Sequence, residues 1–262
     1  MTALLDHLRG PLAEGRKLLV PYVMAGIPDE SSFPSVLAAV AEHGDAVEVG
    51  LPFSDPLMDG PVIAAAGERA IRQGTGPLQG LDLAAVHRES SVPRIVMTYY
   101  NPIHHLGEGE FCRRAEQNGF SGLIVPDLPL EESETLRREA SRRGLAWIPL
   151  VAPTTPPDRV ARVAGSATGF VYAVSTLGVT GARESLSEKA AAVVAAVRGA
   201  TDLPVLVGLG VSSAEQARAA VLSADGVVIG SAVVRLVEGA GPGAAGDFLA
   251  GVRRAIDEGV AA

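Results

Sequence analysis

Short apolar stretches alternate with amphipathic stretches along most of the chain. The apolar stretches are about four to eight residues long and end near Gly or Pro, a pattern typical of buried β-strands. They cover residues 18–23, 46–50, 94–100, 122–125, 146–150, 169–174, 205–208 and 226–229. The pattern therefore predicts eight strands.

Between these stretches, apolar residues recur at helical spacing. In the segment 29–42, for example, Phe33, Val36, Leu37 and Val40 share one helical face. The predicted helices span residues 2–16, 29–42, 62–73, 78–89, 108–118, 131–143, 157–164, 187–198, 214–222 and parts of 231–260. Each strand is thus followed by at least one helix.

The repeated strand–helix unit predicts an α/β fold with a parallel sheet, because neighbouring parallel strands require a crossover connection. Eight such units in 262 residues favour a closed (β/α)8 TIM barrel, which typically uses about 250 residues. An open doubly wound sheet is the alternative. The short N-terminal helix at 2–16 precedes the first strand and could act as a cap. No linker or compositional break divides the chain, so we expect a single domain over residues 1–262.

Composition limits the function. Hydrophobic residues make up 47% of the chain, yet no apolar run approaches the roughly 20 residues of a membrane span. The N-terminus lacks the features of a secretory signal, and the single cysteine, Cys112, excludes an internal disulfide. We therefore expect a cytoplasmic protein without membrane contact. The net charge of −8 argues against nucleic acid as a partner but allows a local site for a small phosphorylated ligand.

Two carboxylates near the end of the second strand are candidates for acid–base catalysis. Glu48 lies inside the apolar strand 46–50, where a glutamate is costly to bury unless it is paired or has a function. Asp59 lies in the loop that follows, and barrel active sites occupy such loops. The structural alternative is that Asp59 and Asp55 only order the loop or cap the next helix. A structural explanation is harder to give for Glu48, because glutamates inside strands have few structural uses.

Three strand exits late in the chain are rich in glycine: residues 177–181, 207–210 and 229–231. In barrels, the loops after the seventh and eighth strands often bind phosphate through backbone N–H groups and a helix N-terminus. Each glycine could instead simply end a strand, but three such exits in consecutive units favour a phosphate site. The chain contains no P-loop motif, so a nucleotide P-loop is not supported.

Other residue types narrow the chemistry. The two lysines, Lys17 and Lys189, are not placed at strand exits, which disfavours Schiff-base catalysis. The histidines lack metal-ligand spacing, and the adjacent His104 and His105 are expected to be loop residues, so no metal is expected. Cys112 is interpreted as a packing residue. With Schiff-base and metal catalysis disfavoured, the reaction class that remains is general acid–base chemistry on a phosphorylated small molecule.

Five motifs, in order and at matching spacing, resemble the tryptophan synthase α subunit family. They occupy residues 49–61 (VGLPFSDPLMDGP), 97–103 (MTYYNPI), 125–129 (VPDLP), 178–181 (GVTG) and 208–212 (GLGVS). The resemblance extends from about Leu18 to Val237. It implies a (β/α)8 barrel that cleaves indole-3-glycerol phosphate to indole and glyceraldehyde 3-phosphate without metal or cofactor.

The resemblance also assigns roles to individual residues. Glu48 would be the acid/base that protonates indole C3 and takes up the proton of the glycerol hydroxyl, while Asp59 would accept the hydrogen bond of the indole N–H. The remaining implied substrate-binding residues are Gly181, Gly210, Gly230 and Ser231 for the phosphate, Tyr22 and Tyr172 for the indole pocket, and Thr180 in the closing loop.

The family implies a partner, the pyridoxal-phosphate-dependent tryptophan synthase β subunit, in an α2β2 assembly. Met58 replaces a more usual alanine, and His105-Leu106-Gly107 replaces a more usual aromatic before glycine. Both departures lie in loops that contact the β subunit in the family. A stand-alone lyase that releases indole for specialised metabolism is therefore an alternative. A sugar-phosphate isomerase or epimerase on the same fold, and an inactive barrel that only activates a β subunit, also stay open.

Overall fold

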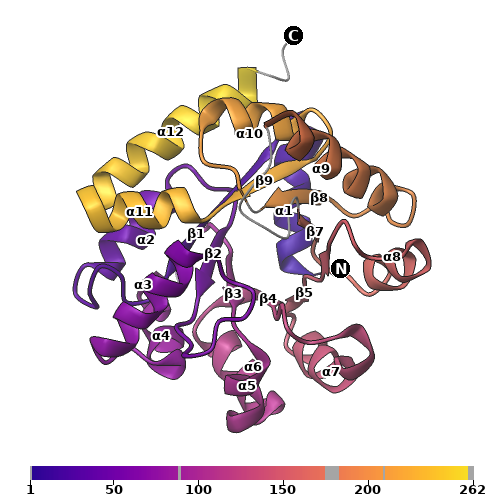
Figure 1. Ribbon diagram of the computed structural model, residues 1–262. Coiled ribbons are helices and arrows are strands. Elements are labelled where there is room, and N and C mark those ends of the chain that lie inside the picture. Colours follow the sequence, from indigo (N-terminus) through magenta and orange to yellow (C-terminus); the bar gives the residue numbers. More distant parts are fainter. Residues whose placement is uncertain (1, 88–89, 175–182, 209, 259–262) are drawn as a thin grey trace.

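Parallel strands lie at the centre of the molecule and helices surround them (Figure 1). The computed structural model describes residues 2–87, 90–174, 183–208 and 210–258. Its strands are β1 Leu18–Met24, β2 Val47–Gly50, β3 Arg94–Met97, β4 Phe120–Ile124, β5 Ala146–Trp147, β6 Leu150–Val151, β7 Val171–Val174, β8 Val205–Gly208 and β9 Gly226–Ile229. They form one sheet in the order β5-β4-β3-β2-β1-β9-β8-β7-β6, in which every strand pair is parallel.

The sheet closes through the segment that joins its two edge strands. β5 and β6 are the two parts of the strand predicted at 146–150, separated by Ile148 and Pro149. The N–H of Ile148 donates to the carbonyl of Leu123 in β4 at 3.1 Å, and the N–H of Tyr172 in β7 donates to the carbonyl of Pro149 at 3.0 Å. Proline has no N–H to donate, which explains the break in the strand. The (β/α)8 prediction is confirmed.

The helices follow the predicted alternation. They are α1 Ala3–Ala13, α2 Phe33–Ala41, α3 Pro61–Arg72, α4 Pro77–Leu83, α5 Tyr100–Leu106, α6 Glu108–Gln117, α7 Glu134–Arg142, α8 Pro157–Ala164, α9 Arg183–Arg198, α10 Ala214–Val221, α11 Ser231–Ala240 and α12 Pro242–Glu258, with short 3₁₀ helices η1 Ala84–His87 and η2 Leu130–Glu132. Among the described residues, no helix is both long and apolar enough to cross a membrane.

Several local predictions were wrong: α9 begins four residues before the predicted residue 187, and two further errors have a clear physical reason. The predicted strand 94–100 ends at Met97, and α5 then begins at Tyr100, so His104 and His105 are helical residues rather than loop residues. Pro102 is compatible with this helix because it lies in the first turn, where the backbone N–H has no partner in the helix.

The second error concerns the start of α2, which lies four residues after the predicted Asp29. The carboxylate of Asp29 accepts hydrogen bonds from the N–H of Ser32 at 2.9 Å and from the hydroxyl of Ser31 at 2.6 Å. These bonds hold residues 29–32 in a turn of the Asx type, which competes with the helix.

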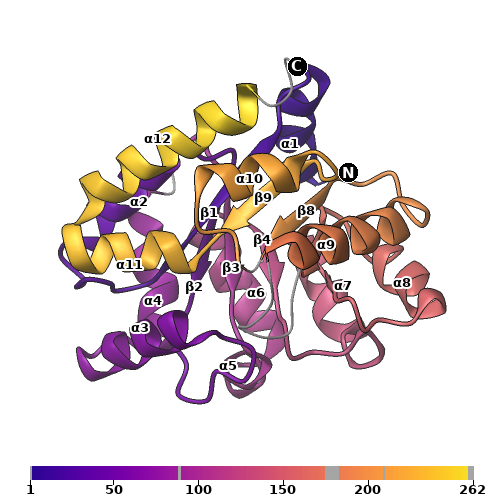
Figure 2. The same ribbon diagram turned by 45° about the horizontal axis from the view of Figure 1, so that its top comes forward.

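The core has two layers, one inside the barrel and one between the strands and the outer helices. Leu18, Val20 and Leu206 are fully buried in the inner layer. Leu4 and Leu8 of α1 belong to the same layer, and α1 lies at the end of the barrel where the strands begin (Figure 2). The prediction that the first helix acts as a cap is therefore confirmed.

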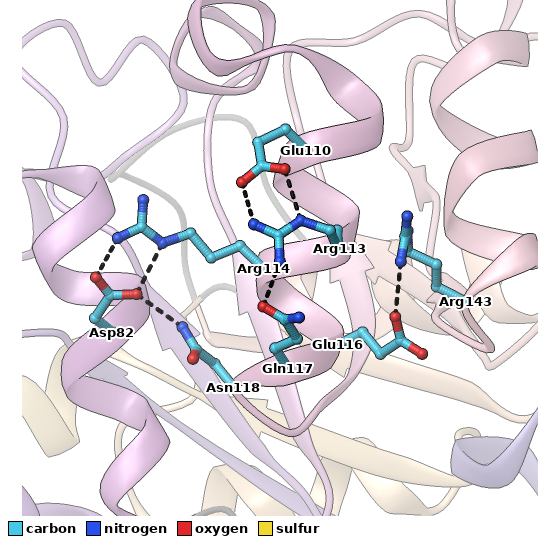
Figure 3. Close-up of polar contacts among 8 residues, drawn as sticks. All are labelled: Asp82, Glu110, Arg113, Arg114, Glu116, Gln117, Asn118 and Arg143. Atoms are coloured by element: carbon cyan, nitrogen blue, oxygen red, sulfur yellow. Dashed lines mark hydrogen bonds and ion pairs between the residues drawn. The ribbon is translucent and has the colours of Figure 1, made fainter.

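Polar contacts between helix surfaces add to this packing. Figure 3 shows α6 between its neighbours: Arg114 pairs with Asp82 of α4, and Arg143, which follows α7, pairs with Glu116 at 2.9 Å. Asn118 also donates to Asp82 at 2.9 Å. Such partly exposed pairs typically contribute at most about 1 kcal/mol each. They link neighbouring outer helices and involve none of the predicted site residues.

Candidate active site

Glu48 is a buried carboxyl group near the C-terminal end of β2. It lies in register with Tyr22 of β1 and Ile95 of β3, and only 1% of the residue is exposed. Its Oε2 atom has no hydrogen-bond partner among the described residues. Burial, and secondarily the negative charge of Asp59, raises the pKa of Glu48 from 4.5 to about 8. The carboxyl group is therefore protonated at neutral pH and available as an acid.

Asp59 lies in the loop between β2 and α3, two residues before the first residue of that helix, and is partly buried. Burial raises its pKa, while a hydrogen bond from the Tyr99 hydroxyl opposes that rise. The charge of Asp59 acts on Glu48, so the structure brings the two predicted carboxylates together. Their environments differ: Glu48 is fully buried and has an oxygen without a partner among the described residues, whereas Asp59 is partly exposed and has its pKa lowered by the Tyr99 hydroxyl.

Two phenols are packed over glycines at strand ends. A Cβ atom at Gly50 would lie 1.9 Å from the hydroxyl oxygen of Tyr22, and one at Gly208 would lie 2.2 Å from that of Tyr172. Neither distance is possible for a real side chain, so both tyrosines need glycine at these positions. Tyr22 and Tyr172 are 4% and 8% exposed. The two rings therefore form buried walls near the C-terminal ends of β1, β2, β7 and β8.

The two phenols are close enough to the carboxylates to be affected by their charge. Burial raises the pKa of Tyr172 well above its ordinary value, and the charge of Glu48 adds to this effect. Burial also raises the pKa of Tyr22, with further contributions from Asp59, Glu48 and Tyr99. These mutual electrostatic effects indicate that the predicted catalytic residues and the predicted indole-pocket residues share one region of the barrel.

Tyr99 is the site residue that sequence reasoning missed. Its hydroxyl oxygen accepts a hydrogen bond from the N–H of Met58 at 3.0 Å, and its ring stacks on Phe53 with 5.3 Å between ring centroids. The signal that could have found it is the strand alternation: Ile95 faces the barrel interior, and positions 95, 97 and 99 share one face of an extended chain.

The predicted phosphate residues lie at the ends of β8 and β9. Gly230 is the N-cap of α11 and Ser231 is its first residue. The N–H of Val234 is bonded to the carbonyl of Gly230 at 3.0 Å, so the N–H groups that precede it in the first turn have no acceptor within the helix. Gly210 has a φ of +97°, a conformation that favours glycine. A helix N-terminus of this kind, next to a strand exit that contains glycine, suits an anion.

Two further predicted site residues, Thr180 and Gly181, lie outside the described residues. β7 ends at Val174, and the described chain resumes at Arg183 in α9. The roles that the family resemblance assigns to this loop stay predictions.

The described residues contain no group of three or more His, Cys, Asp or Glu side chains that could hold a metal. Cys112 is fully buried, and burial, with the charge of Glu139, raises the pKa of its thiol to about 12, which makes it a poor nucleophile. The ammonium group of Lys17 donates to the carbonyl of Ala224 at 2.8 Å, next to the start of β9 and away from the carboxylates.

Two hollows of the structure lie elsewhere. One of about 430 Å³ is lined by η2, α7 and the C-terminal end of α8, and one of about 350 Å³ lies between α1 and the residues that precede β8 and β9. Neither is lined by Glu48, Asp59 or the two phenols. The candidate site is therefore defined by its buried polar groups and not by these hollows.

Fold and site together define a (β/α)8-barrel enzyme of the acid–base type. The tryptophan synthase alpha chain family matches residues 9–248. The chain is 46% identical to the alpha chain of Carboxydothermus hydrogenoformans over 228 residues, which cover 86% of this chain and 85% of the relative. It is 42% identical to that of Synechococcus elongatus over 260 residues, 98% of each chain. The chain belongs to the tryptophan synthase alpha chain family.

Solved structures agree with this assignment. Tryptophan synthase of Mycobacterium tuberculosis superposes with a TM-score of 0.91 at 36% identity and covers 98% of both chains. The alpha subunit from Legionella pneumophila superposes with a TM-score of 0.90 at 31% identity and covers 98% of this chain and 99% of the other. These relatives are tryptophan synthase chains, and they do not favour an isomerase, an inactive barrel or a stand-alone lyase.

Proposed function

We propose that this protein cleaves indole-3-glycerol phosphate to indole and glyceraldehyde 3-phosphate, as the α subunit of tryptophan synthase in tryptophan biosynthesis. The observation that carries the proposal is the carboxyl group of Glu48, which is 1% exposed, has an oxygen without a partner among the described residues and is under the electrostatic influence of a second carboxylate. An acid that is held protonated at neutral pH is what the first step of this reaction requires.

The reaction follows from the two carboxylates. The protonated Glu48 donates its proton to C3 of the indole ring, and the electrons for the new C–H bond come from the ring. Positive charge then develops on the ring nitrogen, and Asp59 stabilises it by accepting the hydrogen bond of the indole N–H. The resulting Glu48 carboxylate takes the proton of the glycerol hydroxyl as the C=O bond forms and the C–C bond breaks. The electrons of the broken bond restore the aromatic indole, and Glu48 is protonated again.

The remaining predicted residues bind the substrate in this proposal. The phosphate accepts hydrogen bonds from the N-terminus of α11 at Gly230 and Ser231 and from the backbone at Gly210. Tyr22 and Tyr172 hold the flat indole ring through their buried rings. Thr180 and Gly181 complete the site from the loop after β7. No metal or other cofactor takes part.

A tryptophan synthase β subunit is the proposed partner, in an α2β2 assembly. Several similar solved structures are of tryptophan synthase, which supports such a partner. In this chain Leu57 and Met58 are 84% and 46% exposed on the Asp59 loop. Exposed apolar side chains of this size suit a protein interface. Met58, which replaces the family's more usual alanine, is one of these two exposed side chains.

Indole release from indole-3-glycerol phosphate by the purified chain, with and without a tryptophan synthase β chain, tests the proposal. We expect slow release by the isolated chain and an increase when the β chain is present. Release that the β chain does not change would contradict the proposed partner, and no release under either condition would contradict the proposed substrate.

A further inference from the structure

The Asp59 loop, residues 51–60, is fixed to the barrel at both ends but exposed between them. At its start the N–H of Leu51 donates to the carbonyl of Met97 at 2.9 Å. Within residues 52–59 the backbone bonds are local: the N–H of Leu57 donates to Asp55 at 2.9 Å, and that of Asp59 donates to Pro56 at 3.4 Å. Such short-range bonds set the shape of the loop but not its place over the barrel.

The side chain of Tyr99 supplies the missing contact. Among the described residues, the backbone of residues 52–59 makes one hydrogen bond to a residue outside the loop. In this bond the N–H of Met58 donates to the Tyr99 hydroxyl. The ring of Tyr99 stacks on Phe53, near the other end of the loop, at an interplanar angle of 29°. Tyr99 is 4% exposed and follows β3, so it is a rigid support for a largely exposed loop.

The hydroxyl group also acts on the carboxylate itself. The Tyr99 oxygen accepts from the N–H of Met58, and the same hydroxyl lowers the pKa of Asp59 while Asp59 raises the pKa of Tyr99. A phenol has one donor and two acceptor positions, so its O–H is available to a nearby carboxylate. One hydroxyl group therefore positions the backbone next to Asp59 and influences its side chain.

We propose that Tyr99 is a positioning residue that holds Asp59 over the active site, with its hydroxyl bonded to the Met58 amide beside Asp59 and its ring stacked on Phe53. The inference rests on the proposed function, because it concerns how the catalytic aspartate is placed. Tyr99 needs no contact with the reacting atoms for this role.

The substitution Tyr99→Phe tests it, since it keeps the stacked ring and removes the hydroxyl. We expect kcat for indole release to fall about tenfold, as for loss of a hydrogen bond that leaves the Met58 N–H without its partner, with KM changed less than about threefold. The acid limb of the kcat profile should move to higher pH, because the Tyr99 hydroxyl lowers the pKa of Asp59. A purely structural role would not move this limb.

Tyr100→Phe is the matched control. It removes the neighbouring phenol hydroxyl, which bonds to Glu108 at 3.0 Å and not to Asp59, and should leave kcat and the acid limb unchanged. In an Asp59→Asn background, Tyr99→Phe should cause little further loss, because the carboxylate that it positions is gone. A second variant, Phe53→Leu, removes the stacking partner and should lower kcat in the same direction.

The outcomes separate the two proposals. Failure of the unaltered chain to release indole would contradict the proposed function. An active unaltered chain with an equally active Tyr99→Phe variant, or an unmoved acid limb, would overturn the inference alone. If Tyr99→Phe yields no folded protein by thermal unfolding, Phe53→Leu decides: wild-type kcat in that variant would overturn the inference.

Discussion

Replacing Glu48 by Gln should stabilise the protein at neutral pH while removing its activity. The folded protein keeps Glu48 protonated up to a pKa of about 8, whereas the unfolded chain loses this proton near 4.5. Below pH 4.5 both states are protonated, so Glu48 imposes no pH-dependent cost. Between pH 4.5 and 8 the folded state binds more protons than the unfolded state, so the free energy of unfolding falls as the pH rises.

The size of this effect follows from the pKa difference. Each pKa unit corresponds to about 1.4 kcal/mol. Glu48 therefore lowers the stability by less than about 1 kcal/mol at pH 5, by about 3 kcal/mol at pH 7 and by about 5 kcal/mol well above pH 8. Glutamine has nearly the same shape and does not titrate, so this trend should be absent from the variant.

Urea unfolding of both proteins at pH 5, 7 and 8.5 measures the effect. We expect the free energy of unfolding of Glu48→Gln, relative to that of the unaltered protein, to increase from pH 5 to pH 8.5. Any destabilisation caused by the amide group itself does not depend on pH and shifts all three differences equally. A stability difference that does not depend on pH would refute the reasoning, because it would show that Glu48 ionises with an ordinary pKa in the folded state.

The remaining predictions concern the reaction, the packing and the ion pairs. Because Glu48 must be protonated, kcat for indole release should fall as the pH rises through about 8, and a kcat profile that stays flat to pH 9 would contradict this. Gly50→Ala should raise KM and cost about 1–3 kcal/mol in urea unfolding, because the new methyl group overlaps the phenol of Tyr22; unchanged KM and stability would show that the ring moves freely. Asp45→Asn should lower the free energy of unfolding by about 3 kcal/mol, because Asp45 is 7% exposed and is bonded to a guanidinium of α12 and to a backbone N–H of β1. Arg114→Gln at the surface pair of Figure 3 should lower it by less than about 1 kcal/mol. Equal unfolding free energies for these two variants would contradict the expected difference between a buried and a surface ion pair.

The barrel could be predicted from the sequence because its signals are local and repeated. Glu48 was found for the same reason: a charged residue inside an apolar strand is conspicuous, and the structure buries it without a partner for Oε2 among the described residues. The position of Asp59 near it required the fold, since that position depends on how the loop between β2 and α3 lies over the barrel.

Features that depend on contacts distant in sequence were missed. Tyr99 acts on a loop 41 residues away in the chain; strand alternation can place its side chain inside the barrel, but it cannot show which loop the side chain contacts. The sequence predicts a strand end and a loop where α5 lies, because the apolar run 94–100 continues past the last strand residue, Met97. The late start of α2 depends on the side-chain bonds of Asp29, which compete with helix formation.

The central claim is that two differently placed carboxylates cleave a carbon–carbon bond. The most direct test is indole release from indole-3-glycerol phosphate by the purified chain and by its Asp59→Asn variant, with unfolding curves to confirm that both are folded. We predict release by the unaltered chain and a loss of at least about a hundredfold in kcat for the variant, in line with the usual contribution of a positioned acid–base or electrostatic group. Equal release by both proteins, or no release by the unaltered chain, would contradict the account.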